Sequence, residues 1–263
     1  MDHPTPPPAS EGSTARMAIP TSPASPTSPA TLPISETFLS VQGEGKLTGV
    51  PSFFIRTSGC NLRCRWCDTP YASWNPERTI RSVDELVDEV AASGVRHAVL
   101  TGGEPMMFPS LDRLAQALRE RSIHITIETA GTLFRELPCD LMSISPKLAD
   151  STPKPGDPRD PSGSWRLLHD QRRINPPVIQ SLIDRSPDFQ LKFVVSGEAD
   201  LAEIQDLLGL LRGWRPSDVL LMPEGVTPPS PTTRQWLVQA CVRRGYRYCP
   251  RLHIDLFGHT RGT

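Results

Sequence analysis

Short apolar runs and amphipathic helical segments alternate along most of the chain. Runs such as "SFFIRTSG" (52–59) and "FQLKFVVSG" (189–197) are rich in β-branched and aromatic residues and predict buried strands. The segment "SVDELVDEVAASG" predicts a helix in which Ser82 is the N-cap, Glu85 completes a capping box and Gly94 ends the helix. Strands that alternate with crossover helices indicate an α/β fold with a mostly parallel sheet.

The other expected elements continue this alternation. Further strands are expected at 97–103, 124–131, 141–147, 218–225 and near 246–258. Further helices are expected at 110–122, 176–186, 200–213 and 232–245. Roughly six strand–helix units are too few for a full eight-fold barrel, so we expect an incomplete β/α barrel or an open sheet.

Unusual polar and glycine-rich segments follow the expected strands directly. They are "TSGCNLRC", "TGGEP", "ETAG", "SPK", "SGE" and "MPEG". Ligands of α/β proteins bind at the carboxyl ends of the strands. The pattern therefore predicts that these segments meet at one mouth of the fold.

Two segments depart from this pattern. Residues 1–33 are dominated by proline, serine and threonine and offer little to pack, which predicts a disordered tail before a catalytic domain at 34–263. The proline-rich stretch Ser151 to Trp165 predicts an exposed loop inside that domain.

Charge and hydropathy exclude several classes of function. The formal net charge is −1, which argues against binding to a nucleic-acid backbone. No apolar run is long enough to span a membrane, and the N-terminus lacks the basic-then-apolar order of a secretory signal. We therefore expect a cytoplasmic protein, in which clustered cysteines bind metal or do chemistry more often than they form disulfides.

Cys60, Cys64 and Cys67 form a C-x3-C-x2-C cluster, while Cys139, Cys241 and Cys249 are scattered. Structural zinc normally takes four ligands in paired units, and three crowded cysteines suit neither disulfides nor an ordinary core. Zinc and inert cysteines remain as alternatives. An iron–sulfur cluster is favoured, because thiolates suit it and three of them leave one of four irons open to another ligand.

These cysteines, with Trp66 just before the third, resemble the motif of the radical S-adenosylmethionine (SAM) superfamily, as does "TGGEP" (101–105). The resemblance implies a 4Fe–4S cluster whose open iron is chelated by the amino and carboxylate groups of SAM. The two glycines of "TGGEP" permit close backbone approach. Glu104 is expected to offer an acceptor to the ammonium of the cofactor.

One branch of the superfamily is matched from about residue 34 to the end of the chain. The chain resembles the 7-carboxy-7-deazaguanine synthases in "FLSVQGEGKLTGVPSFFIRTSGCNLRCRWCDT", "TGGEP", "ETAGT", "SISPKL", "LKFVV", "LMPEG" and "RLHIDLFGHTRG". This resemblance implies a lyase that converts 6-carboxy-5,6,7,8-tetrahydropterin to 7-carboxy-7-deazaguanine for queuosine-type deazapurines of tRNA. A 5′-deoxyadenosyl radical would take hydrogen from C6, and ring contraction would follow with loss of ammonia.

The resemblance also implies roles for individual residues. Substrate contacts are expected at Val41, Gln42, Gly43, Glu44, Arg56, Thr101 and Thr263. Cofactor contacts are expected at Trp66, Asp68, Gly103, Glu104, Ser145, Pro146, Lys147, Met222, Pro223, Glu224 and Gly225. Thr69 is expected to bind Mg²⁺ beside the substrate carboxylate, and Arg251, His253 and the terminal carboxylate are expected to close over the pterin.

Plainer interpretations of these residues stay open. "QGEG" could be a surface hairpin, Arg56 a surface ion pair, Thr69 a helix cap and Lys147 a solvated lysine. A glycyl-radical-enzyme activase and a non-enzymatic metal module are the rival functions. The expected partners are the pterin, a reductant such as flavodoxin or ferredoxin, and a second copy in a homodimer.

Overall fold

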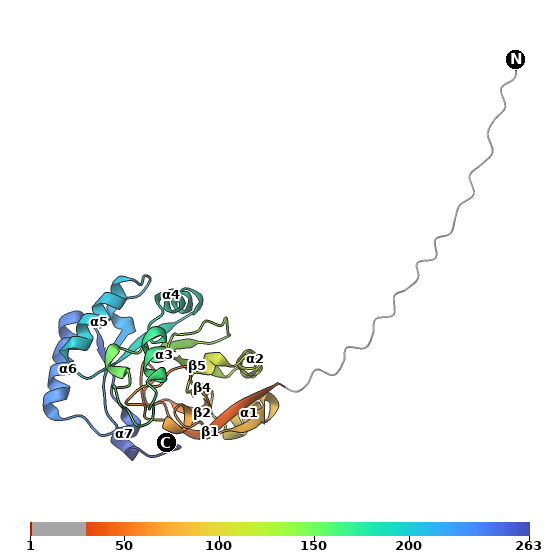
Figure 1. The fold of residues 1–263 in the computed structure, drawn as a ribbon. Helices are drawn as coiled ribbons and strands as arrows, with labels where there is room; N and C mark the ends of the chain where they lie inside the picture. The colour runs from red at the N-terminus through yellow and green to blue at the C-terminus, as the bar shows by residue number, and fades with distance from the viewer. Residues whose placement is uncertain (2–29) are drawn as a thin grey trace.

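The computed structural model describes Met1 and residues 30–263, which fold around one nine-stranded sheet (Figure 1). The strands are β1 (Thr31–Val41), β2 (Pro51–Thr57), β3 (Thr79–Ser82), β4 (His97–Gly102), β5 (His124–Thr129), β6 (Leu141–Ile144), β7 (Phe189–Val195), β8 (Val219–Pro223) and β9 (Arg247–Tyr248). Their order across the sheet is β3-β1-β2-β4-β5-β6-β7-β8-β9. All pairs from β2 to β9 are parallel, and β1 is antiparallel to both of its neighbours. The expectation of a mostly parallel α/β sheet is confirmed.

Seven α-helices lie around this sheet in the described residues (Figure 1). They are α1 (Val83–Ser93), α2 (Leu111–Glu120), α3 (Ser164–Arg172), α4 (Pro176–Arg185), α5 (Glu198–Gly209), α6 (Pro231–Arg244) and α7 (Leu252–Phe257). The start of α1 is as expected: Ser82 Oγ accepts from the Glu85 backbone N–H at 3.2 Å, and Glu85 accepts from the Ser82 N–H at 2.9 Å. Gly94 ends this helix in the left-handed region, with φ of 75°.

The core fills the space between the sheet and its helices. Strand residues Ile55, Leu100, Ile127 and Phe193 share one face of the sheet, belong to the same core cluster as the helix residues, and are at most 1 % exposed. None of the described helices is both long and apolar enough to cross a bilayer.

The strand β1 corrects the expected start of the folded region. Residues 31–33, which were assigned to the tail, pair with β3, and Leu32 is completely buried. The Pro33 carbonyl accepts from the Ser58 N–H at 2.8 Å. The expectation of a disordered tail otherwise concerns residues 2–29, which lie outside the described part of the chain.

Two further expectations were wrong in detail. The stretch 151–165 is not simply an exposed loop: Ser151 is fully buried, Asp160 is 4 % exposed, and α3 begins at Ser164. The Asp160 carboxylate accepts from the N–H groups of Trp165 and Arg166 and so caps this helix. The expected closing strand is only the two-residue β9, which is followed by the short helix α7.

His97 should make the stability of the fold depend on pH. Its ring contacts Ser52 Oγ at 2.7 Å and Thr126 Oγ1 at 2.8 Å. Burial and the neighbouring His124 lower the pKa of His97 to about 4, although Asp140 opposes the shift. His97 of the unfolded chain therefore binds a proton near pH 6.5, whereas His97 of the folded chain binds it only near pH 4. The stabilisation is complete above pH 6.5 and is lost as the pH falls toward 4, by at most about 1.4 kcal/mol per pH unit.

Urea unfolding of wild type and His97→Gln at several pH values checks this prediction. Glutamine keeps polar atoms at the site but does not titrate. The wild type should lose stability more steeply than the variant between pH 6.5 and 4. Parallel curves for the two proteins would contradict the assignment.

Candidate active site

A cavity of about 320 Å³ lies at the carboxyl ends of the parallel strands. This volume is within the range of small-molecule sites. Most of the expected site residues line it: Val41, Gln42, Gly43, Glu44, Arg56, Cys60, Cys64, Trp66, Cys67, Asp68, Thr69, Thr101, Gly103, Ser145, Lys147, Met222 and Thr263. The structure thus brings segments from the whole length of the sheet to one mouth, as the sequence predicted.

Five of the expected cofactor contacts do not line this cavity. They are Glu104, Pro146, Pro223, Glu224 and Gly225. The Glu224 N–H donates to the Val195 carbonyl at 3.0 Å, and the Gly225 carbonyl accepts from Arg251. These two residues therefore contribute to the framework that joins β7, β8 and the C-terminal segment.

The Glu104 side chain is used inside the protein framework. It is completely buried, and its carboxylate accepts from the Thr129 hydroxyl at 2.9 Å and from the N–H groups of Ala130 and Met106 at 2.8 and 3.0 Å. Burial raises the pKa of Glu104, and these hydrogen bonds partly offset the rise. The carboxylate joins the ends of β4 and β5, and Glu104 does not line the cavity.

Gly103 is required by close backbone contact. A Cβ at this position would lie 2.2 Å from the Gly59 carbonyl oxygen and 2.7 Å from that of Ala72. The Glu104 N–H donates to the same Gly59 carbonyl at 2.9 Å. The "TGGEP" turn therefore fits directly against the chain just before Cys60, as the two glycines predicted.

The three clustered cysteines carry free thiols at the cavity wall. Burial raises the pKa of Cys60 to about 12, although a hydrogen bond from the Leu62 N–H opposes the shift. Burial likewise raises the pKa of Cys64. Such thiols are protonated at neutral pH, so binding a metal must release their protons. Cys139, Cys241 and Cys249 are also free but buried, and none of them lines the cavity.

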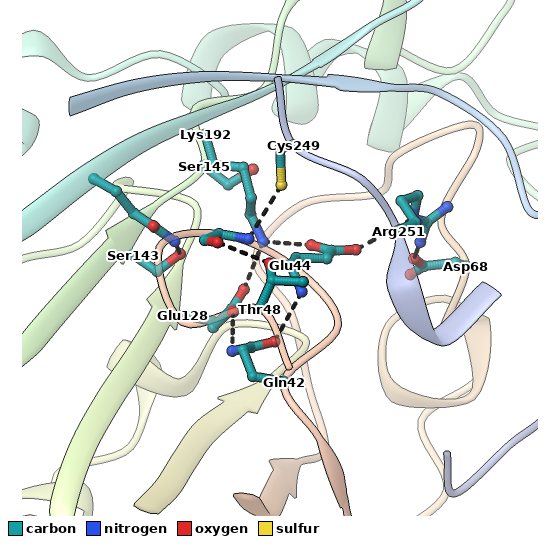
Figure 2. Close-up of polar contacts among 12 residues, drawn as sticks. Gln42, Glu44, Thr48, Asp68, Glu128, Ser143, Ser145, Lys192, Cys249 and Arg251 are labelled. Atoms are coloured by element: carbon teal, nitrogen blue, oxygen red, sulfur yellow. Dashed lines mark hydrogen bonds and ion pairs between the residues drawn. The ribbon is translucent and has the colours of Figure 1, made fainter. Parts of the chain in front are cut away.

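Lys192 on β7 stands between two carboxylates at the cavity floor (Figure 2). Its Nζ lies 2.9 Å from Glu128 and also pairs with Glu44, and the lysine side chain is only 3 % exposed. Burial disfavours the charge, but the two carboxylates outweigh it and raise the pKa of Lys192. Burial would also raise the pKa of Glu44, yet Lys192, Arg251 and His253 hold it well below its usual range. Lys192 and Glu44 are therefore both charged.

The "QGEG" loop is fixed against this cluster. Gln42 donates to Glu128 at 3.2 Å and accepts from the Glu44 N–H at 3.2 Å (Figure 2). A Cβ on Gly43 would lie 2.0 Å from the His253 ring, so only glycine fits there. The loop is thus part of the cavity and not a free surface hairpin.

Two arginines lie at the cavity wall in ion pairs. Arg56 Nε lies 2.6 Å from Glu36, and no partner is found for its terminal amino groups in residues 30–263. Arg251 joins Glu44 at 3.2 Å and also pairs with Asp68. Arg56 is therefore a paired arginine that still presents two terminal donors.

The C-terminal segment closes one side of the cavity. Arg261 pairs with Glu36 at 3.0 Å and lies 4.0 Å over the Tyr71 ring, and Thr263 reaches the cavity wall. The His253 and Arg251 side chains line the same wall. That this end of the chain closes over a bound pterin stays a prediction.

Comparisons with known proteins decide which family this site represents. Residues 54–155 match the model of the radical SAM superfamily. A 7-carboxy-7-deazaguanine synthase of Rhodopirellula baltica is 47% identical over 238 residues, 90% of this chain and 90% of the relative. That of Halobacterium salinarum is 45% identical over 88% of this chain and 93% of its own length. The chain belongs to the 7-carboxy-7-deazaguanine synthase family. The solved structure of QueE from Escherichia coli shares the fold, with a TM-score of 0.62 and 25% identity over 85% of this chain and 95% of that one.

Membership in the 7-carboxy-7-deazaguanine synthase family makes the chain a radical SAM lyase of queuosine-precursor biosynthesis. It decides against the glycyl-radical activase and against a non-enzymatic metal module. A 4Fe–4S cluster and SAM come with the superfamily.

The residues that line the cavity fit a 4Fe–4S cluster and SAM. The free thiols of Cys60, Cys64 and Cys67 line one cavity, and the other three cysteines do not line it. The indole N–H of Trp66 is buried at the same wall and has no hydrogen-bond partner within the described residues. Such an orphaned donor beside Cys67 suits a site that is completed by a bound molecule.

The sequence analysis missed Glu128 and Lys192 as members of this synthase site. Glu128 belongs to the quoted "ETAGT" and Lys192 to "LKFVV", so the motifs contained both residues without indicating their role. A lysine with alternate apolar neighbours in a strand was the available signal, because a buried lysine needs a charged partner.

Proposed function

We propose that this cavity converts 6-carboxy-5,6,7,8-tetrahydropterin to 7-carboxy-7-deazaguanine with loss of ammonia. The observation that carries the proposal is that three free cysteines and a buried set of charged groups face the same cavity. A reduced 4Fe–4S cluster with bound SAM supplies the 5′-deoxyadenosyl radical for the reaction. The protein contributes binding, orientation and exclusion of water.

Cys60, Cys64 and Cys67 would hold the cluster, and no other cysteine is needed. Beside them, Lys147 Nζ donates to Ser145 Oγ at 2.8 Å and lies 6.0 Å over the Trp66 ring. Trp66 and Ser145 are thereby held in place at the wall. We assign these three residues, with Gly103, Asp68 and Met222, to the SAM side of the cavity.

The carboxylates of Glu44 and Glu128 would accept hydrogen bonds from the N–H groups of the pterin ring. Lys192 pairs with both carboxylates and fixes their positions, so that both can accept hydrogen bonds at the cavity without reorganisation. Phe38 stacks on Phe54 at 4.7 Å, and both line the cavity as an apolar wall against which a flat ring can pack. Gln42, Gly43, Val41 and Thr101 complete this side.

Arg56 would bind the substrate carboxylate. Its Nε is held by Glu36, which leaves the two terminal amino groups at the cavity wall for a carboxylate. Glu36 is in turn fixed by Tyr71, whose hydroxyl donates to it at 2.9 Å. The arginine is thus oriented before substrate arrives.

A selectivity experiment tests this arrangement. Anaerobic turnover and binding are compared for the 6-carboxylated tetrahydropterin and for tetrahydropterin without the 6-carboxylate. The compound without the carboxylate should bind much more weakly, and Arg56→Gln should reduce this difference. Equal binding of the two compounds to wild-type protein would contradict the assignment.

We assign Thr69 to Mg²⁺. Its side chain makes no capping hydrogen bond, although the residue occupies the N-cap position of the 3-10 helix Pro70–Ala72. The hydroxyl lies 3.7 Å from Cys67 Sγ and at the cavity wall. Mg²⁺ commonly takes few protein ligands and completes its shell with water and substrate oxygens.

Thr69→Ala should raise the Mg²⁺ concentration needed for half-maximal turnover by roughly tenfold. This is the lower end of the loss in metal affinity that follows removal of a supporting contact at a metal site. Pterin binding should weaken as well, while SAM cleavage without substrate should persist. Mg²⁺ titration against product formation measures the effect, with the exposed Thr232→Ala on α6 as control. Superimposable titration curves for Thr69→Ala and wild type would exclude the ligand role.

We also propose that an external one-electron reductant such as flavodoxin or ferredoxin donates the electron that reduces the cluster. Turnover requires an electron that the chain's own residues do not provide. A homodimer and a cytoplasmic location remain predictions from the sequence analysis.

A further inference from the structure

The chain segment 148–172 lies against the cysteine loop 60–67 and forms hydrogen bonds on both sides of Cys64. The backbone N–H of Arg63 donates to His169 Nδ1 at 3.1 Å. The backbone N–H of Arg65 donates to the Ser151 carbonyl at 2.8 Å. The two residues that flank the central cysteine are therefore both held by this segment through their backbone N–H groups.

His169 on α3 is held in one defined form. Its ring is completely buried, and Nδ1 must be unprotonated because it accepts from a backbone N–H. Nε2 then carries the hydrogen and donates to Ser151 Oγ at 2.8 Å, and that hydroxyl donates to the Leu148 carbonyl at 2.6 Å. The ring thus connects the cysteine loop to the turn that also receives the Arg65 N–H.

Side chains add further contacts between segment 148–172 and the cysteine loop. The Arg63 guanidinium lies 3.8 Å over the Trp165 ring, and Arg65 donates to both carboxylate oxygens of Asp150 at 2.7 and 2.5 Å. Arg159 donates to the Arg65 carbonyl at 2.9 Å. Segment 148–172 therefore has the contacts to hold the cysteine loop in a single conformation.

We propose that His169 is a positioning residue that orders the cysteine loop, so that Cys64 faces the cavity before the cluster is bound. The inference rests on the proposed cluster site at Cys60, Cys64 and Cys67. A short loop with three cysteines must otherwise lose its conformational freedom when the cluster assembles. Holding the N–H groups on either side of Cys64 removes most of that cost in advance.

Three substitutions separate the contacts of His169. His169→Asn places an acceptor near the position of Nδ1, His169→Gln places its amide near the position of Nε2, and His169→Phe removes both polar atoms. The buried His97 of the sheet, replaced by Phe, is the matched control, because it is not in contact with the cysteine loop. Each holoprotein is reconstituted anaerobically with iron and sulfide.

Iron content, the electron paramagnetic resonance (EPR) spectrum of the reduced cluster and the rate of cluster loss to a chelator are measured. His169→Phe and His169→Gln should lose the cluster roughly tenfold faster than wild type, with a broadened spectrum, and His169→Asn should recover most of the difference. His97→Phe should lower the melting temperature but leave spectrum and loss rate unchanged.

The inference is overturned if His169→Phe matches wild type in loss rate and spectrum, or if His97→Phe loses the cluster as fast. If His169→Phe does not fold, equal behaviour of the Asn and Gln variants overturns it. Wild-type protein that assembles no cluster would instead contradict the proposed function itself.

Discussion

Alanine at any one of Cys60, Cys64 and Cys67 should abolish cleavage of SAM by the reduced protein. A 4Fe–4S cluster held by three thiolates loses its stable attachment when one of them is removed, and within the described residues no other cysteine lines the cavity to replace it. Iron content, visible absorbance and formation of 5′-deoxyadenosine measure the loss. The expected effect is complete, since the radical chemistry depends wholly on the bound groups.

The scattered cysteines provide the matched controls. Cys139, Cys241 and Cys249 are buried and do not line the cavity, so their replacement by alanine should leave cluster assembly intact at a modest cost in stability. Cys249 also accepts from the Gly45 N–H at 3.1 Å, so only cluster assembly is compared for that variant. Loss of the cluster in one of these three variants would overturn the ligand assignment.

Lys192→Met should produce the second largest effect. Methionine leaves Glu128 without its cationic partner and Glu44 with Arg251 alone, and breaking such a buried pair costs about 3–5 kcal/mol. One carboxylate should then protonate or move, and the acceptors for the pterin ring are lost from their positions. We expect kcat/KM for the pterin to fall by roughly 100-fold or more, while SAM cleavage without substrate continues.

Lys46→Met is the control for this prediction. Lys46 pairs with Asp188 and Asp218, but it does not line the cavity. Its loss should lower the melting temperature and leave the KM for the pterin unchanged. The role of Lys192 would be refuted if both methionine variants changed the kinetics of pterin turnover to the same small extent.

Helices and strands were predicted correctly where the signal lies in neighbouring residues. They were mispredicted where contacts between distant segments decide the structure. The capping box of Ser82 and Glu85 lies within four residues, so the start of α1 was predictable. The cap of α3 is Asp160, which lies in a stretch dominated by proline, and the helix was missed. The strand β1 was not predicted. The expected domain start at residue 34 left out its first residues, because Pro33 resembles the composition of the tail, whereas pairing with β3 decides their conformation.

The candidate site shows the same division. The cysteine spacing and the glycines of "TGGEP" predicted which segments meet at the cavity. The Glu104 carboxylate was assigned to the cofactor, but it is used to join β4 to β5, which only the hydrogen bonds of the folded chain reveal. Lys192 lies 148 residues from Glu44 in the sequence, so their ion pair is a product of the sheet order and has no local signature.

Product analysis tests the central claim most directly. Reconstituted protein is incubated anaerobically with reductant, SAM, Mg²⁺ and 6-carboxy-5,6,7,8-tetrahydropterin, and the mixture is analysed by mass spectrometry. The proposed function predicts 7-carboxy-7-deazaguanine, one ammonia lighter than the substrate, in wild type and none in Cys64→Ala. Formation of 5′-deoxyadenosine by a fully loaded cluster, with the pterin recovered unchanged, would contradict it.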